Sequence, residues 1–322
     1  MIKALAITGP TASGKTALSL LVAKEFDCEI ISCDSMQIYR DMNIGTAKAT
    51  ANERALVPHH LIDFLDPGLS YSAEEYREDA MAAARDITER GGLPLFVGGT
   101  GLYIDTVIRG GAQISPPSNA EYRQRLLAGC DTEGGIDALW QRLNEVDPAS
   151  AEKIHKNNVR RVARALEIYE LSGKTKTYFD ERSKEVSPDV RVLMLTLDFY
   201  NRDLLYERVD KRVDMMIGEG LVDEVRGLYE RGVLNGENTA SAAIGYKELL
   251  AYIRGEVSLD DAIALLKQSS RRYAKRQLTW FRHESDAIRI FADYENGGLK
   301  DLETLCKEAV TKIKESEFLN DD

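Results

Sequence analysis

An eight-residue segment near the amino terminus constrains this chain more than any other feature. Gly9 to Thr16 reads GPTASGKT and matches the pattern G-x-x-x-x-G-K-[ST] without a gap. The apolar run Ile2–Thr8 before it predicts a buried strand, and Ala17–Phe26 after it predicts a helix. This is the strand–loop–helix context of a phosphate-binding loop, in which backbone N–H groups and the helix N-terminus face an anion. The segment therefore predicts an anion site in an α/β fold.

The side chains of this segment suit a phosphate group. Lys15 adds a positive charge, and the Thr16 hydroxyl is a ligand for Mg²⁺, which we expect as the cofactor. We expect the whole loop to bind the phosphate, namely Gly9, Pro10, Thr11, Ala12, Ser13, Gly14, Lys15 and Thr16. Because such loops are typical of kinases and nucleoside triphosphatases, other parts of the sequence must decide what carries the phosphate.

Strand and helix patterns alternate through the first part of the chain. Ser72 and Glu75 form a capping box for a helix that ends at Gly91-Gly92. Short apolar runs predict further strands at Glu29–Cys33, Leu93–Val97, Arg191–Leu197 and Ile288–Phe291. This alternation predicts a P-loop NTPase-like α/β fold, with a parallel sheet flanked by helices.

The pattern changes between Pro116-Pro117 and Pro188, where only helix signals remain. The predicted helices are Ala120–Leu127, Ile136–Glu145 and Val159–Leu171, with Gly173 at a helix C-terminus. We therefore expect two domains. Residues 1–115 and 189–322 would form a catalytic core whose segment from Asn201 to Phe281 is mostly helical, and residues 116–188 would form an all-helical insert.

Two polar residues follow predicted strands. Asp34 comes after the second strand, and Thr100 follows the glycines that end the strand Leu93–Val97. The carboxyl ends of parallel strands share one edge of the sheet, where ligands bind, so both residues should lie beside the phosphate-binding loop. Asp34 could instead be an ordinary turn residue, and Thr100 a helix N-cap. A single carboxylate beside a phosphate site suits a general base better than a two-metal centre.

Charge is distributed unevenly along the chain. The net charge is −11, yet two segments carry basic residues and no acid. These residues are Lys267, Arg271, Arg272, Lys275, Arg276 and Arg282 in one segment, and Lys156, Arg160, Arg161 and Arg164 in the other. An acidic protein with two basic stripes can hold a polyanion locally, although a solvated helix face is the alternative.

Other compositional features exclude some classes of protein. No apolar run approaches the length that a transmembrane helix needs, which argues against a membrane partner. The four cysteines are scattered and form no C-x-x-C pair, so we expect reduced thiols, no zinc site and a cytoplasmic location.

Several motifs beyond the phosphate-binding loop resemble the bacterial tRNA dimethylallyltransferase family, also called tRNA isopentenyltransferases or IPP transferases. The resemblance runs in order from about residue 3 to residue 283. The motifs after GPTASGKT are Asp34-Ser35, Tyr39, Asn43 to Lys48 (NIGTAK), His59 to Leu61, Asp66-Pro67, Tyr71 to Ala73, Val97 to Tyr103 (VGGTGLY), Arg164 to Glu167, Gly245-Tyr246 and Lys275 to Trp280 (KRQLTW).

The resemblance implies transfer of a dimethylallyl group from dimethylallyl diphosphate to N6 of the adenine next to the tRNA anticodon (position 37), with release of diphosphate. It implies that Asp34 is the general base and that Thr100 donates a hydrogen bond to the diphosphate. It implies no obligate protein partner. The tRNA contacts that it implies are Ser35, Met36, Gln37, Arg123, Arg160, Arg161, Val162, Ala163, Arg164, Gly245, Tyr246, Lys247, Arg276 and Gln277.

The partners of two arginines remain open, and three other functions remain as alternatives. Arg208 and Arg212 lie four residues apart, and one could reach the diphosphate, but ion pairs with Glu207, Asp210 or Asp214 are the favoured interpretation. A small-molecule kinase would explain the loop but not the basic stripes. An isopentenyltransferase for free AMP or ADP would need no RNA stripe. An RNA-binding regulator would not need an intact Lys15, Thr16 and Asp34.

Overall fold

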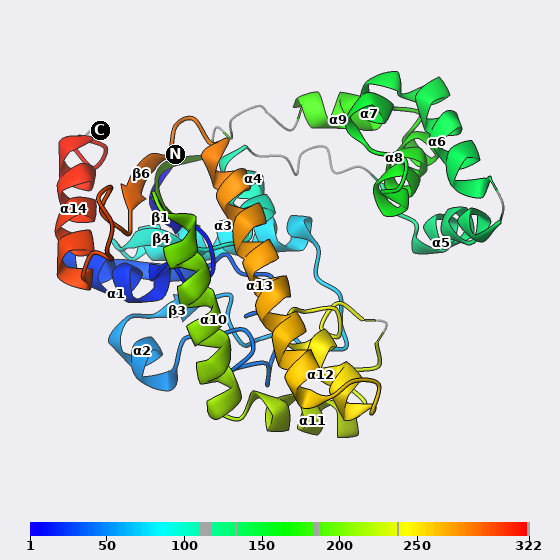
Figure 1. The fold of residues 1–322 in the computed structure, drawn as a ribbon. Helices are drawn as coiled ribbons and strands as arrows, with labels where there is room; N and C mark the ends of the chain where they lie inside the picture. Colours follow the sequence, from blue (N-terminus) through cyan, green and yellow to red (C-terminus); the bar gives the residue numbers. More distant parts are fainter. Residues whose placement is uncertain (110–116, 133, 183–186, 188, 237, 321–322) are drawn as a thin grey trace. The chain divides into compact units, whose positions relative to one another are not determined.

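A computed structural model describes residues 1–109, 117–132, 134–182, 187, 189–236 and 238–320 (Figure 1). The chain divides into two compact units. The first contains residues 1–107 and 189–322, and the second contains residues 108–188.

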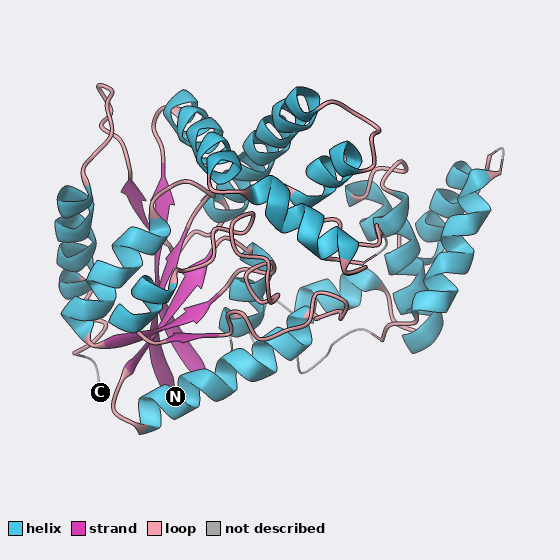
Figure 2. Ribbon diagram, turned by 90° about the horizontal axis from the view of Figure 1, so that it is seen from below, coloured by secondary structure: helices cyan, strands magenta, loops and turns pink. Residues whose placement is uncertain are grey.

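The first unit is built on one sheet of six parallel strands (Figure 2). Their order across the sheet is β3-β2-β4-β1-β5-β6. The strands are β1 (Ile2–Thr8), β2 (Cys28–Ser32), β3 (His59–His60), β4 (Leu93–Gly98), β5 (Val190–Asp198) and β6 (Ile288–Phe291). The predicted parallel sheet is confirmed. Strand β3 was not predicted, because two residues are too short to show a periodic pattern.

Helices cover both faces of this sheet. Leu5 and Ile7 of β1 pack with α1 (Lys15–Phe26) and α14 (Leu302–Glu315), which lie side by side (Figure 1). Ala4 and Ala6 alternate with them on the other face, where α3 (Ala73–Glu89) contacts the central strands. The predicted capping box begins α3, since the Ser72 hydroxyl accepts from Glu75 N–H (3.1 Å) and Glu75 accepts from Ser72 N–H (2.7 Å). Helix α14 follows the last predicted element and was not expected.

A second layer of helices packs over the loop that follows β2. It consists of α10 (Arg202–Gly218), α11 (Leu221–Glu230), α12 (Tyr246–Ile253) and α13 (Leu259–Arg282). Their apolar faces form a separate core with Met42 and Tyr39. Helices α2 (Ala51–Leu56) and α4 (Gly101–Ile108) complete this unit. The carboxyl ends of β1, β2 and β4 are therefore covered mainly by α10 and α13.

The second unit is helical throughout its described part. Its helices are α5 (Ala120–Ala128), η2 (Gly129–Asp131), α6 (Gly135–Val146), α7 (Pro148–Lys153), α8 (Val159–Ser172) and α9 (Lys176–Arg182). As predicted, α8 ends at Gly173, which adopts φ +66°. Helix α7 was missed, although Asp147 caps it and Pro148 occupies its first turn. Of the prolines that bound the predicted insert, Pro116 and Pro188 lie outside the described residues. Within the described part of the chain, no helix is both long and apolar enough to cross a membrane.

Candidate active site

A cavity of about 380 Å³ lies in the first unit, where the loops after β1, β2 and β4 meet α10 and α13. The phosphate-binding loop contributes Thr11, Lys15 and Thr16, and the loop after β2 contributes Asp34. Sequence order keeps these loops apart, and the parallel sheet brings them together at one edge. The cavity is therefore where the predicted catalytic residues would act.

The phosphate-binding loop depends on conformations that glycine favours. Gly14 has φ +100° at the start of α1, and Gly9 has φ +137°. A Cβ atom on Gly9 would lie only 2.8 Å from the carbonyl oxygen of Leu197 on β5, so the loop needs glycine there for space as well. Ser13 Oγ is buried and has no hydrogen-bond partner among the described residues. Because buried polar atoms are normally paired, this hydroxyl suits a site that receives a polar ligand.

Lys15 is held inside this loop. Its Nζ donates a hydrogen bond to the carbonyl oxygen of Pro10 (2.6 Å). Loss of water around the ammonium group and, to a smaller extent, the nearby charge of Arg212 lower the pKa of Lys15 to about 7, whereas Asp34 opposes the change. An anionic ligand would replace the missing water and raise the pKa again.

Within the described part of the chain, the two arginines of α10 do not form the ion pairs favoured from the sequence. Arg208 Nε donates to the carbonyl oxygen of Ala12 (2.7 Å), and Arg212 lines the cavity. Burial lowers the pKa of Arg212, and Asp34 opposes that shift. The neighbouring acids pair with α13 instead, through Arg271–Asp210 (2.6 Å) and Lys267–Asp214 (2.6 Å). The expectation was wrong because helix spacing says nothing about partners on another helix.

Asp34 lines the cavity and also shapes its own turn. Its Oδ1 accepts hydrogen bonds from the backbone N–H groups of Met36 (2.9 Å) and Gln37 (3.4 Å), so the turn interpretation is correct as far as it goes. The same carboxylate lies within electrostatic range of Lys15 and Arg212. These two bonds use Oδ1 and leave the other oxygen available for chemistry.

Thr100 is bonded to the loop that carries Asp34. Its Oγ1 accepts from Ser35 N–H (3.1 Å), and α4 begins at the next residue. Thr100 thus joins the loop after β4 to the loop that carries Asp34. The hydroxyl of Tyr273 on α13 also interacts with Thr100 and with Gln277. Thr100 is not part of the cavity lining itself, whereas Gly98 and Gly99 are.

Gln277, an expected tRNA contact, lines the cavity and also joins two loops of the site. Its Oε1 accepts from Thr11 N–H (2.8 Å), and its Nε2 donates to the carbonyl oxygen of Gly99 (2.9 Å). Both ends of this buried amide are therefore used to clamp the phosphate-binding loop to the glycines after β4. A Cβ atom on Gly99 would lie 2.2 Å from Gln277 Nε2, so a side chain there would displace the amide that makes these bonds.

The other predicted tRNA contacts in the first unit have mixed positions. The cavity lining includes Ser35, Met36, Gln37, Gly245, Lys247 and Arg276. Tyr246 is fully buried, and its hydroxyl donates to Glu224 Oε1 (2.6 Å), so its side chain faces the protein interior and its contact with tRNA stays a prediction. The Arg276 guanidinium lies over the Tyr273 ring, 5.5 Å from its centroid.

In the second unit, burial also separates the predicted contacts. Val162 and Ala163 are 0% exposed and belong to its core, so their side chains cannot contact RNA. Arg123 and Arg164 both pair with the buried carboxylate of Glu167, at 3.0 Å and 2.7 Å. The exposed members of the set are Arg160 and Arg161. Alternation of basic and apolar residues on α8 marks one face as buried, a signal that the sequence already contained.

No cluster of metal ligands accompanies the cavity. Among the described residues, no group of three or more His, Cys, Asp and Glu side chains could hold a metal ion. The cavity does place the Thr16 hydroxyl and the Asp34 carboxylate around one space. Such a site suits Mg²⁺, which takes few protein ligands and completes its shell with phosphate oxygens and water.

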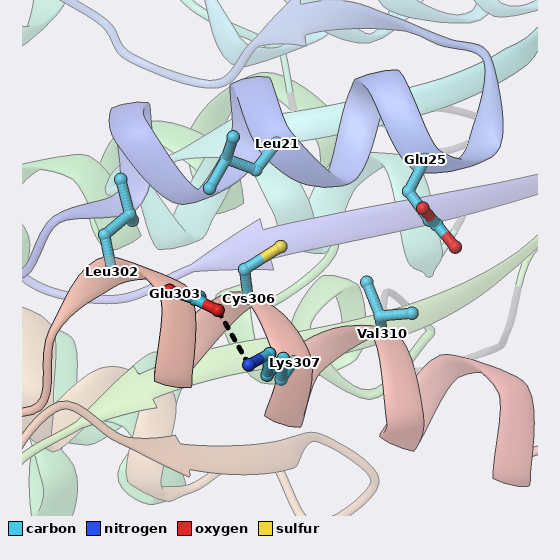
Figure 3. Close-up of a pocket in the computed structure, with 7 residues that line it drawn as sticks. All are labelled: Leu21, Glu25, Leu302, Glu303, Cys306, Lys307 and Val310. Carbon is cyan, nitrogen blue, oxygen red and sulfur yellow. Dashed lines mark ion pairs between the residues drawn. The ribbon is translucent and has the colours of Figure 1, made fainter.

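A second hollow, of about 490 Å³, lies between α1 and α14 (Figure 3). Leu21, Leu302, Cys306 and Val310 give it an apolar floor. Its charged residues are paired, through Lys307–Glu303 (2.7 Å) and through Glu25 with Lys314 (2.8 Å). Because it offers no unpaired charge and no phosphate-binding loop, the active-site candidate remains the cavity under α10 and α13.

Comparison with known proteins identifies relatives along nearly the whole chain. The IPP transferase family model matches residues 37–284, and the isopentenyl transferase model matches residues 2–63. The chain is 48% identical to a tRNA dimethylallyltransferase of Bacillus mycoides over 88% of both proteins. It is 42% identical to the structure of a tRNA isopentenylpyrophosphate transferase from Bacillus halodurans, with a TM-score of 0.70 over 99% of both chains. A eukaryotic dimethylallyltransferase acting on tRNA matches with 30% identity and a TM-score of 0.79, covering 99% of this chain and 80% of that one.

Proposed function

This chain belongs to the IPP transferase family, and from that premise we propose that it transfers a dimethylallyl group from dimethylallyl diphosphate to N6 of the adenine adjacent to the tRNA anticodon. The observation that carries the proposal is the two-sided character of the cavity. Lys15 and Arg212 supply charge at the end that holds the phosphate-binding loop. Val209, Val213 and Met216 supply an apolar wall from one face of α10.

A dimethylallyl diphosphate matches both sides of this cavity. Lys15, the loop N–H groups and the Ser13 hydroxyl suit the diphosphate, and the burial of the two cations strengthens their attraction for it. The aliphatic wall suits the five-carbon tail, because residues at i, i+4 and i+7 share one helix face. A nucleoside triphosphate would instead place a polar sugar against these aliphatic side chains.

The transfer requires stabilisation of the diphosphate leaving group and removal of a proton from N6 of the adenine. The allylic C–O bond breaks and its electron pair leaves with the diphosphate, while the N6 lone pair forms the new C–N bond. Lys15 and Arg212 would stabilise the developing charge on the diphosphate oxygens, as preorganised cations do in a water-poor site. The Asp34 carboxylate would accept the proton that N6 loses. Thr100 would act by holding the turn that positions Asp34.

Mg²⁺ is compatible with this scheme although the cavity offers few protein ligands. We propose that the Thr16 hydroxyl, with the Asp34 carboxylate nearby, would hold Mg²⁺, an ion that needs few protein ligands. When bound, the ion would neutralise charge on the leaving group.

The acceptor is proposed to be tRNA, in which the target base leaves its stack to reach an enclosed donor. Residues 108–188 are proposed to contact the tRNA through Arg160 and Arg161. Arg276 and Lys247 at the cavity lining would contact it from the catalytic unit. With tRNA as the acceptor, we propose that the enzyme acts in the cytoplasm.

A turnover assay tests the proposal. Purified protein, dimethylallyl diphosphate and Mg²⁺ are combined with unmodified tRNA or with AMP, and prenylated product is measured by mass spectrometry. We expect product from tRNA with a kcat/KM far above that for AMP. Equal use of AMP would replace this function with a free-nucleotide isopentenyltransferase, and no product with either acceptor would exclude both.

A further inference from the structure

A carboxylate outside the predicted site organises one wall of the cavity. Glu224 lies in the first turn of α11, and its Oε2 accepts from the N–H groups of Asn43 (2.9 Å) and Ile44 (2.8 Å). Its Oε1 accepts from the N–H of Gly45 (3.1 Å) and from the hydroxyl of Tyr246 (2.6 Å). One side chain therefore binds three consecutive backbone donors and a buried tyrosine on α12.

These four hydrogen bonds join parts of the chain that lie far apart in sequence. The turn from Asn43 to Gly45 follows β2, whereas Glu224 and Tyr246 come from the helical layer, where α11 and α12 pack together. The contact is also sterically tight, because a Cβ atom on Gly45 would lie 2.5 Å from the Tyr246 ring. Replacement of the carboxylate would leave the hydroxyl of the buried Tyr246 and the partly buried N–H groups of Ile44 and Gly45 without this acceptor, which is costly.

The turn that Glu224 holds continues directly into the cavity lining. Gly45, Thr46 and Ala47 line the cavity, and the carbonyl oxygens of Thr46 and Ala47 accept from Gln37 Nε2 (3.2 and 3.3 Å). Gln37 in turn donates its backbone N–H to Asp34 (3.4 Å). A displacement of the turn would therefore pass to Gln37 and to the neighbourhood of the general base.

The phosphate-binding end of the cavity is supported separately. Arg208 and Gln277 bind that loop from α10 and α13, and neither bonds to the turn from Asn43 to Gly45 in the described structure. Different residues therefore hold the two ends of the cavity in place: Arg208 and Gln277 at the phosphate-binding end, and Glu224 at the other end.

We propose that Glu224 is a positioning residue for the acceptor side of the cavity. It fixes the turn from Asn43 to Gly45 and Tyr246 against each other, and thereby sets where Gln37 and the cavity-lining turn meet the incoming adenine. The proposal rests on the proposed function, since it names the acceptor side by the tRNA reaction. It assigns no contact with substrate to Glu224.

Steady-state kinetics with each substrate varied in turn tests this role. In Glu224→Gln an NH₂ group faces backbone donors, so we expect kcat/KM for tRNA to fall by about 10²-fold, as misplacement of a site wall does, with the KM for dimethylallyl diphosphate unchanged within about twofold. Tyr246→Phe removes one of the four hydrogen bonds and should lower the same quantity by about tenfold. Asp223→Asn removes a charge from the same helical turn at an exposed position, and is the matched control.

Three results would overturn the proposal. The first is an equal rise in the KM for the donor. The second is a loss of thermal stability in both Glu224→Gln and Tyr246→Phe with unchanged kinetics well below their Tm, which would make the cluster merely structural. The third is an equal loss of kcat/KM in Asp223→Asn. Wild-type protein in the same assay distinguishes failure of the proposed function from failure of the role proposed for Glu224. A wild type that does not prenylate tRNA refutes the proposed function itself.

Discussion

The cations of the cavity and those along α13 differ in their partners. Lys15 and Arg212 have lost much of their water, which lowers the pKa of both, and the nearby carboxylate is Asp34. On α13, Lys267 and Arg271 pair with acids of α10, and Arg282 pairs with Asp198 of β5 (2.6 Å). Arg272, Lys275 and Arg276 of the same segment form no ion pair within the described residues.

This difference distinguishes cations that bind a ligand from cations that stabilise the packing of the protein. Two desolvated cations that share a single carboxylate are costly until an anion arrives, so they indicate a ligand. A cation paired across a helix interface is already neutralised and attracts a polyanion weakly. Of the six basic residues in the α13 segment, three therefore belong to packing, and a count of charge along the sequence overestimates the RNA-binding surface.

The largest effect should come from the one carboxylate of the cavity. Asp34→Asn removes the proposed base and keeps the bonds that its Oδ1 accepts, so turnover should fall by about 10²–10⁴-fold while the fold is retained. Single-turnover measurements with saturating donor report the chemical step. A decrease of less than about tenfold under these conditions would mean that Asp34 is not the base.

Removal of the desolvated cations should come next. Lys15→Ala and Arg212→Gln each delete one charge aimed at the diphosphate, and kcat/KM for dimethylallyl diphosphate should fall by about 10²–10³-fold. The dissociation constant for tRNA, measured by filter binding without donor, should not change. Donor kinetics equal to wild type in either variant would remove that residue from the diphosphate site.

A smaller effect is expected from the exposed arginines of α8. Arg160→Ala with Arg161→Ala should raise the KM for tRNA and leave the donor KM unchanged. The slope of log K against log salt should become shallower by about 0.7–0.9 for each phosphate that the variant no longer binds. Lys156→Ala is the control, because Lys156 is paired with Asp137 (2.5 Å). The same slope in the double variant and wild type would contradict a role for α8 in RNA binding.

The smallest effect should follow from breaking the paired cations of α13. Lys267→Gln and Arg271→Gln each remove a partly exposed ion pair with α10, which is worth about 0–1 kcal/mol of unfolding free energy. Thermal denaturation should show a slightly lower Tm, and the salt dependence of tRNA binding should stay as in wild type. A shallower slope of log K for tRNA against log salt in these variants would show that both residues belong to the RNA-binding surface.

Much of the fold was legible in the sequence because its signals are local. Leu5 and Ile7 in a short apolar run, the capping box of Ser72 and Glu75, and the GPTASGKT loop each depend on neighbours within a few residues. Parallel strands share one edge, so even the meeting of Asp34 with Lys15 followed from element order. The short strand His59–His60 and helix α7 were missed, since so few residues carry little periodic signal.

Partners across the molecule were decided only by tertiary structure. Nothing in the sequence indicated that Arg208 would bind Ala12 or that Gln277 would clamp two loops. The same holds for Glu224, which lies 181 residues from Asn43 along the chain yet accepts its N–H. A periodic pattern shows which face of a helix is buried, but long-range packing chooses what that face meets, and the energy of a charge depends on that neighbour and on the water that packing removes.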